Sequence, residues 1–116
     1  MVSEQDFDEL LTEALEELPL WVQEIIEREN IVICGREKAS PGVLDKDSNR
    51  ILGLFRGVPY GSRSREPLPP RIEIYRQPML ENYGPDNLKE KIKKTLIHEI
   101  GHFLGMSEEE VRRRGF

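Results

Sequence analysis

Apolar residues recur every three or four positions near the start of the chain, which is the spacing of a helix with one buried face. Ser3 and Asp6 form a capping-box pattern just ahead of that run, whose apolar members are Phe7, Leu10, Leu11, Ala14, Leu15 and Leu18. Pro19 interrupts the run and suits the first turn of a new helix, whose apolar face continues to about Glu29. The pattern predicts two consecutive helices.

Three shorter stretches predict strands. Residues 31–34 are mostly β-branched, and residues 51–55 predict a second strand or a hairpin with the first. Residues 71–76 alternate polar and apolar side chains, which indicates a strand with one buried face. Pro70 and Pro78 flank this strand and favour a position at the edge of the sheet, where a missing backbone donor costs least.

A second helical pattern lies near the C-terminus. It begins around residues 85–87 after a predicted loop at 79–84, and it ends at about Leu104, where Gly105 suits a helix C-cap. Ser107 and Glu110 form another capping box for a short last helix. Helices, strands and helices in this order predict an α+β fold, and we expect one domain over residues 1–116. Its small, mixed or mostly antiparallel sheet would pack on the N-terminal helices and the C-terminal helix.

Composition narrows the class of protein. A hydrophobic fraction of 37% and a charged fraction of 34% are typical of a globular chain and argue against wholesale disorder. No apolar run approaches the roughly 18 residues that a membrane-spanning helix needs, so we expect no membrane partner. The acidic N-terminus lacks the pattern of a secretory signal, and Cys34 is the single cysteine. The expected location is therefore cytoplasmic.

Charge is unevenly distributed along the chain. Residues 1–29 hold ten acidic residues and one basic residue, although the net charge of the whole chain is only −5. This asymmetry predicts an acidic N-terminal helix beside a mildly basic body. The basic clusters are short and not interleaved with aromatic residues, so the sequence does not favour nucleic-acid binding; they are Arg63/Arg65 and Lys89/Lys91/Lys93/Lys94.

The candidate chemistry lies in the segment His98-Glu99-Ile100-Gly101-His102. Two histidines four residues apart project from the same helix face, so both imidazoles can reach one tetrahedral Zn²⁺ ion. Glu99 lies beside the first histidine, where it can accept a proton from a metal-activated water and pass it to a leaving amine. This pattern predicts a zinc metallopeptidase with His98 and His102 as ligands and Glu99 as general base.

Two further features support the metal site. His98 and His102 fall opposite the apolar side of the helix, which is formed by Leu96, Ile97, Ile100, Phe103 and Leu104. A pair of structural histidines would instead belong within that apolar stripe. The chain also has no other histidine.

A catalytic zinc ion needs a third protein ligand, which here cannot be histidine. The extended pattern HExxHxxGxxH/D nominates Glu108, six residues beyond His102. Two alternatives stay open. Glu109 is the nearest rival, and water alone could complete the site. An acid at position 108 would also suit the first turn of a helix without binding metal.

Substrate binding can be predicted less sharply. Zinc proteases often hold an extended peptide as an added strand at a sheet edge. If residues 71–76 form an edge strand, then Ile72, Ile74 and Tyr75 are the candidate substrate contacts, although a plain edge strand fits the pattern equally well. Tyr60, Tyr75 and Tyr83 could each stabilise an oxyanion, but the sequence does not choose among them, and the role is left unassigned.

The chain resembles the minimal zincins, small bacterial zincin-like metallopeptidases formerly grouped as a domain of unknown function. The resemblance rests on the acidic N-terminal helix and on residues 51–59, 70–76 and 95–105. It implies a small sheet beside the active-site helix, without the second subdomain of larger zinc proteases. It also implies a Zn²⁺ cofactor held by His98 and His102, Glu99 as general base, and an acid at the position of Glu108.

The function expected from residues and resemblance together is hydrolysis of a peptide or protein substrate. One alternative is a metal-binding regulatory or interaction module with little or no turnover. A closed structural site of that kind needs four protein ligands, which two histidines and one or two acids supply poorly. A second alternative is a binding protein that carries the motif by accident and binds no metal.

Overall fold

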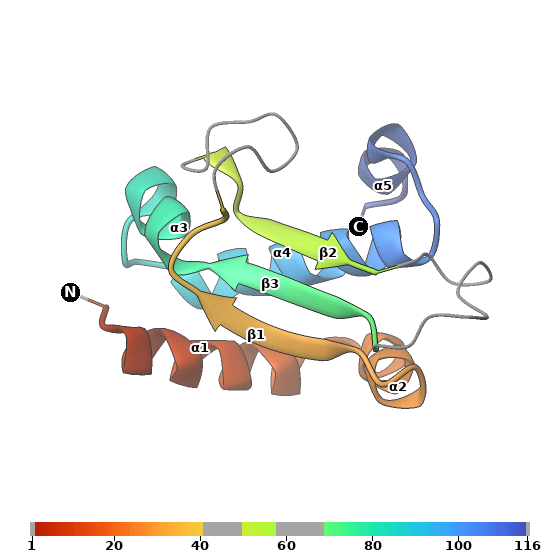
Figure 1. The fold of residues 1–116 in the computed structure, drawn as a ribbon, viewed down its shortest axis with the longest axis horizontal. Helices are drawn as coiled ribbons and strands as arrows, with labels where there is room; N and C mark the ends of the chain where they lie inside the picture. The colour runs from red at the N-terminus through yellow and green to blue at the C-terminus, as the bar shows by residue number, and fades with distance from the viewer. Residues whose placement is uncertain (1, 41–49, 58–68, 116) are drawn as a thin grey trace.

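The computed structural model describes residues 2–40, 50–57 and 69–115. They form five helices and a small mixed sheet, so the predicted α+β class is confirmed (Figure 1). In chain order the elements are α1 (Glu4–Glu17), α2 (Leu20–Arg28), β1 (Val32–Arg36), β2 (Gly53–Arg56), β3 (Arg71–Tyr75), α3 (Arg76–Tyr83), α4 (Leu88–Phe103) and α5 (Glu108–Arg114). Both predicted capping boxes are present, at Ser3 and at Ser107. None of the helices in these ranges is long and apolar enough to cross a membrane.

The sheet has the order β1-β3-β2. β3 pairs in parallel with β1, where Ile33 lies opposite Ile72, and antiparallel with β2, where Gly53 lies opposite Ile74. The predicted edge position of residues 71–76 is therefore wrong, and so is the hairpin between the first two strands. Neither flanking proline interferes with the pairing, because Pro70 precedes β3 and Pro78 lies in the first turn of α3.

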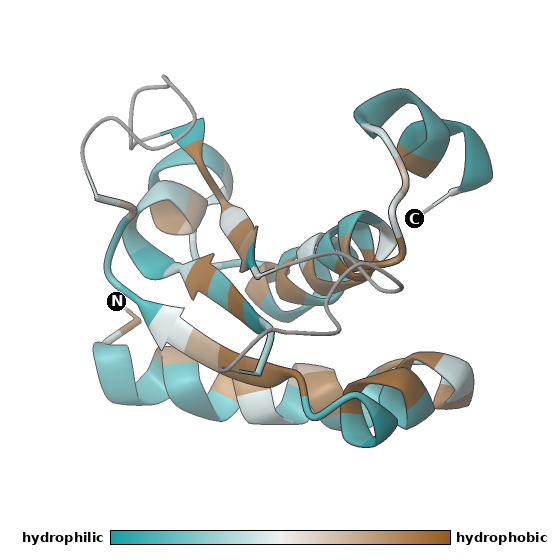
Figure 2. Cartoon of the chain, turned by 45° about the vertical axis from the view of Figure 1, so that its right-hand side comes forward, coloured by the Kyte–Doolittle hydropathy of each residue, from teal (hydrophilic) through white to brown (hydrophobic). Residues whose placement is uncertain are grey.

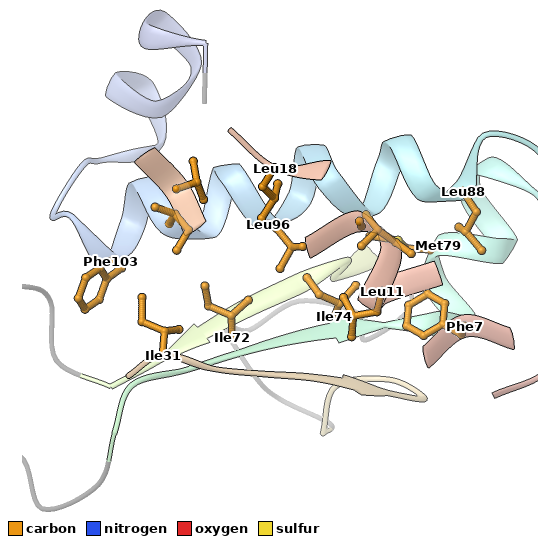
Figure 3. Packing of buried hydrophobic residues seen from close by; sticks show 14 residues of the cluster. Phe7, Leu11, Leu18, Ile31, Ile72, Ile74, Met79, Leu88, Leu96 and Phe103 are labelled. Atoms are coloured by element: carbon orange, nitrogen blue, oxygen red, sulfur yellow. The ribbon is translucent and has the colours of Figure 1, made fainter. Parts of the chain in front are cut away.

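One face of the sheet carries the hydrophobic core. The fully buried Ile72 and Ile74 point from β3 toward α1 and α4, which cover this face (Figures 1 and 3). The larger buried members of the cluster are Phe7, Leu11, Met79, Leu88, Ile92, Leu96, Ile100 and Phe103. α1 and α4 also exchange ion pairs, of which Lys89–Glu17 is the shortest at 2.6 Å. The core thus fixes α4 firmly against the sheet.

The opposite face of β3 is organised around a buried carboxylate. Glu73 is only 2% exposed. Its Oε1 atom accepts hydrogen bonds from Tyr75 Oη at 2.7 Å and from Arg56 Nε at 3.0 Å. Arg36 Nε and Arg71 Nε lie 2.8 and 3.1 Å away. Burial alone would raise the pKa of Glu73, but the bonds from Tyr75 and Arg56 hold it below its ordinary value. The polar positions of the alternating strand therefore form a charged cluster.

α3 is an element that the sequence did not reveal. Residues 79–84 were expected to form a loop, yet α3 follows β3 directly and buries Met79 completely. Arg76, the first residue of α3, pairs with Glu37 at 2.6 Å. A strand that turns into a helix with no intervening residue leaves no loop signal, and Pro78 is well tolerated in a first helical turn.

Candidate metal centre

α4 presents its motif as the helical pattern predicts. Leu96, Ile100 and Phe103 are fully buried, whereas the side chains of His98 and His102 are 27% and 24% exposed. The predicted separation of apolar and histidine faces is confirmed. The core therefore fixes the rotation of α4 and leaves both imidazoles accessible from outside.

The metal-ligating atoms converge. One ligand atom each from His98, Glu99 and His102 lie within 4.8 Å of one another. The Nε2 atoms of His98 and His102 lie 3.0 and 2.9 Å from the same atom, Oε1 of Glu108. Two ligand atoms of a tetrahedral zinc ion, each about 2.0–2.1 Å from the metal, lie about 3.3 Å apart. The contacts of the two Nε2 atoms with Glu108 are thus a few tenths of an ångström shorter than the spacing of two zinc ligands, so Glu108 lies near the place of a further ligand.

A tight turn after α4 brings Glu108 to the histidines. Gly105 has a φ of +89°, and the amide N–H groups of Gly105 and Met106 donate to the carbonyls of His102 and Gly101. This is the Schellman arrangement, in which glycine takes a left-handed conformation that other residues avoid. Ser107 then caps α5, of which Glu108 is the first residue. The predicted role of Gly105 in ending the helix is confirmed.

The chemistry of the donor set also points to a cation. A backbone carbonyl can only accept, so the contact of His102 Nδ1 with Met106 O at 3.1 Å places the proton on Nδ1. The Nε2 lone pair then faces a carboxylate oxygen of Glu108. The Nε2 atom of His102 and the carboxylate oxygen of Glu108 would then both be acceptors and would repel each other. Either a second proton on the imidazole or a metal ion between the two atoms removes this repulsion. Although partial burial alone would raise the pKa of Glu108, the hydrogen bonds to His98 and His102 hold it below its ordinary value.

Glu99 is anchored by a strand that the sequence did not connect with it. Its side chain is 8% exposed, and Oε1 accepts a 2.9 Å hydrogen bond from the backbone N–H of Phe55 in β2. Burial raises the pKa of Glu99 above its ordinary value, against the opposing effects of the two histidines and the Phe55 N–H. Burial and a raised pKa are common features of carboxyl groups that act as general bases or acids.

Gly53 allows β2 to come this close to α4. A Cβ atom on Gly53 would lie 2.7 Å from Cγ2 of Thr95, a distance that real Cβ atoms do not tolerate. The closeness of the two elements therefore depends on the missing side chain. Neither this contact nor that of Phe55 has a local signal in the sequence, because both depend on the register of β2.

The histidines open into a cleft of about 670 Å³. Residues 50–55, which include the start of β2, form one wall, and the exposed face of α4 with His98, Glu99 and His102 forms the other. Glu108, the first residue of α5, also lines the cleft. The cleft therefore lies between the edge strand β2 and α4, whose places in the fold Figure 1 shows.

The predicted substrate contacts are wrong. Ile72, Ile74 and Tyr75 are fully buried in the central strand, and none of them lines the cleft. β1 and β2 occupy both edges of β3, so no peptide can be added to it.

The three tyrosines that could stabilise an oxyanion lie in different parts of the chain. Tyr75 donates to Glu73 on the other face of the sheet. Tyr83 lines the cleft but packs its ring against Lys91, two helical turns before His98. Tyr60 lies outside the described residues. No tyrosine in the described ranges is thus placed beside the histidines.

Comparison with known families gives one match. Residues 28–116 match the family model of the zincin-like metallopeptidases. The match includes the whole sheet, α4 and α5, but it begins after α1, so the acidic helix that entered the sequence resemblance is outside it. No curated protein matches the chain.

Proposed function

The chain belongs to the zincin-like metallopeptidase family, and we propose that it is a zinc-dependent metallopeptidase of the cytoplasm. In this proposal His98, His102 and Glu108 hold the metal ion and Glu99 is the general base. The observation that carries it is the convergence of both Nε2 atoms on Glu108 beside the buried carboxyl of Glu99. The cytoplasmic location rests on the single cysteine, Cys34.

Glu99 does the proton chemistry in this scheme. A zinc ion, when bound, supplies Lewis acidity that lowers the pKa of water to about 7 and polarises a substrate carbonyl. The Glu99 carboxylate accepts the proton of the attacking water and returns it to the leaving amine. The Phe55 N–H orients the carboxyl group for both transfers. The bond from His102 to Met106 keeps the Nε2 lone pair of that histidine directed at the site.

The edge that can take up a peptide is β2, which replaces β3 in this role. Tyr75 N–H donates to Leu52 O, and in an antiparallel ladder such bonded pairs alternate with unbonded ones. The backbone polar groups of Gly53 and Phe55 therefore point away from β3. The Phe55 N–H donates to Glu99. The Phe55 carbonyl and the N–H and carbonyl groups of Gly53 are then the groups directed toward the cleft. An extended substrate paired with them would run between β2 and the histidines.

A second candidate function is a metal-binding module without turnover. It is favoured by one observation, namely that Glu99 lies close enough to the histidines to serve as a fourth ligand. A site closed by His98, Glu99, His102 and Glu108 would leave no position for water. The hydrogen bond from the Phe55 N–H to Glu99 supports the catalytic assignment. It occupies one oxygen of the carboxyl group and orients the group, which favours a general base over a metal ligand.

Substitution of Glu99 by glutamine separates the two functions. We expect Glu99→Gln to keep its zinc and to lose cleavage of a peptide library by about 10²–10⁴-fold, the contribution of a general base. Glu109→Gln, which removes a neighbouring acid, is the matched control and should cleave normally. Loss of zinc from Glu99→Gln would favour the module. A zinc-loaded wild type that cleaves no peptide would contradict the peptidase.

A further inference from the structure

The lysines of α4 fall into two groups with different surroundings. Lys89 and Lys93 face α1, where they lie 2.6 and 3.3 Å from the carboxylate oxygens of Glu17. Lys91 and Lys94 instead line the cleft. The four lysines, which form one cluster in the sequence, thus lie on two faces of α4. One face packs against α1 and the other lines the cleft.

Lys91 and Lys94 differ from Lys89 and Lys93 in their charged surroundings. Within the described ranges, neither Lys91 nor Lys94 forms an ion pair, and Lys91 lies 4.5 Å from the ring centroid of Tyr83. Arg50 adds a third cation on the opposite wall. The acidic residues among the described lining are Glu99 and Glu108, both at the histidine end. Among the described residues, the charged side chains of the other end of the cleft are therefore all basic, in a chain whose net charge is −5.

The spacing along α4 places these cations relative to the histidines. Lys94 and Lys91 precede His98 by four and seven residues, which is about 6 and 10 Å along a helix that rises 1.5 Å per residue. An extended peptide advances about 3.3 Å per residue. The two ammonium groups therefore lie within reach of a substrate group about two or three residues from the bond beside His98.

We propose that Arg50, Lys91 and Lys94 form a basic subsite that binds a carboxylate of the substrate peptide, two or three residues from the cleaved bond. This inference rests on the proposed peptidase function and gives it a substrate class. The carboxylate is either an acidic side chain or the free C-terminus of the peptide. Exposed ion pairs contribute little singly, so we expect the subsite as a whole to give a preference of about tenfold, weakened by salt.

The test compares matched peptides on matched variants. A peptide that the enzyme cleaves is made with glutamate or glutamine two and three residues from the cleaved bond, and with a free or an amidated C-terminus. The wild type should show a higher kcat/KM for the carboxylate-bearing peptides, mainly through KM. Lys91→Gln with Lys94→Gln, which leaves Arg50 alone, should remove most of the preference while the neutral peptides are still cleaved. Lys89→Gln, with the same change of charge on the same helix, should keep it.

The outcomes separate the subsite from the peptidase. If the glutamate series shows the preference, the ligand is a side chain, and if the free-acid series shows it, the ligand is the C-terminus. A wild type without preference, or a double variant that retains it, overturns the subsite while the peptidase stands. If no peptide is cleaved, fluorescence anisotropy of labelled glutamate and glutamine peptides on Glu99→Gln decides the subsite independently. Equal binding of the two peptides overturns it.

Discussion

At the scale of single residues, the proposed general base is held by two elements at once. Glu99 belongs to α4, but the N–H that orients it belongs to Phe55 of β2. This contact requires β2 to lie against α4, which is possible because Gly53 has no side chain to meet Thr95. Gly53, a residue without a reactive side chain, therefore controls the geometry of the proposed base.

Gly53→Ala tests this dependence. The added methyl group would lie 2.7 Å from Cγ2 of Thr95, so we expect a destabilisation of about 1–3 kcal/mol, typical of overpacking, and a lower kcat. Denaturant unfolding and peptide cleavage measure the two effects. Thr95→Ser removes Cγ2 and keeps the hydroxyl, whose bond to Lys91 O it can retain. The double variant should recover most of both losses, and a Gly53→Ala protein that matches the wild type would refute the close packing.

The assignment of the third ligand is a second question at this scale. Glu108 contacts both imidazoles, whereas its neighbour Glu109 contacts neither. We expect Glu108→Gln to weaken zinc binding at least tenfold, the lower range for loss of even an outer-sphere partner. Glu109→Gln should bind as the wild type does. Competition with a fluorescent chelator measures both, and equal affinity of the two variants would remove Glu108 from the site.

At the scale of elements, local signals predicted four of the five helices in the described residues, missed α3, and failed for the order of the strands. Three helix-end signals depend on only a few neighbouring residues each, and the structure confirms all three. They are the capping boxes at Ser3 and Ser107 and the glycine at Gly105 that ends α4. Strand order is not local. The alternation in β3 correctly indicated one apolar face, but its polar face is buried around Glu73 rather than exposed. The contact of Phe55 with Glu99 spans 44 residues and depends on that order.

The charged cluster on β3 gives a prediction in pH. Because the folded pKa of Glu73 is lowered from 4.5, its ionised form stabilises the fold above about pH 4.5, and this contribution is lost as the pH falls through the folded pKa. Glu73→Gln should cost about 1–3 kcal/mol at pH 7, since three guanidinium groups lose a charged acceptor. Urea unfolding at pH 7 and below pH 4 should show the difference shrink in acid.

Glu9→Gln is the control for that measurement. Glu9 is an exposed residue of α1, and its removal changes the net charge equally. It should leave the stability within about 0.5 kcal/mol at both pH values. A Glu73→Gln deficit that does not depend on pH would show that packing, rather than charge, explains the cluster.

At the scale of the whole molecule, the proposed metal site joins α4 to α5, two elements that pack little against each other. Figure 2 shows α5 apart from the sheet, reached from α4 through the turn at Gly105. Val111 is its one buried residue. The contacts of His98 and His102 with Glu108 therefore form a main link between α5 and the body of the protein.

Zinc should consequently order α5. We expect the amides of Glu108–Arg114 to exchange hydrogen more slowly in the zinc-loaded protein than after chelation, because the metal adds its binding free energy to that link. Hydrogen exchange followed by mass spectrometry measures this directly. The amides of α1 serve as an internal reference and should change little. Equal exchange of α5 with and without zinc would mean that α5 takes no part in metal binding.

The central claim is that the two histidines and Glu108 bind one zinc ion on which Glu99 acts. Native mass spectrometry of protein prepared without chelators tests its foundation most directly. One zinc ion per chain is expected in the wild type and in Glu99→Gln, and none in the double variant His98→Ala with His102→Ala. A correctly folded wild type that carries no zinc, and takes up none when zinc is supplied, would contradict the account.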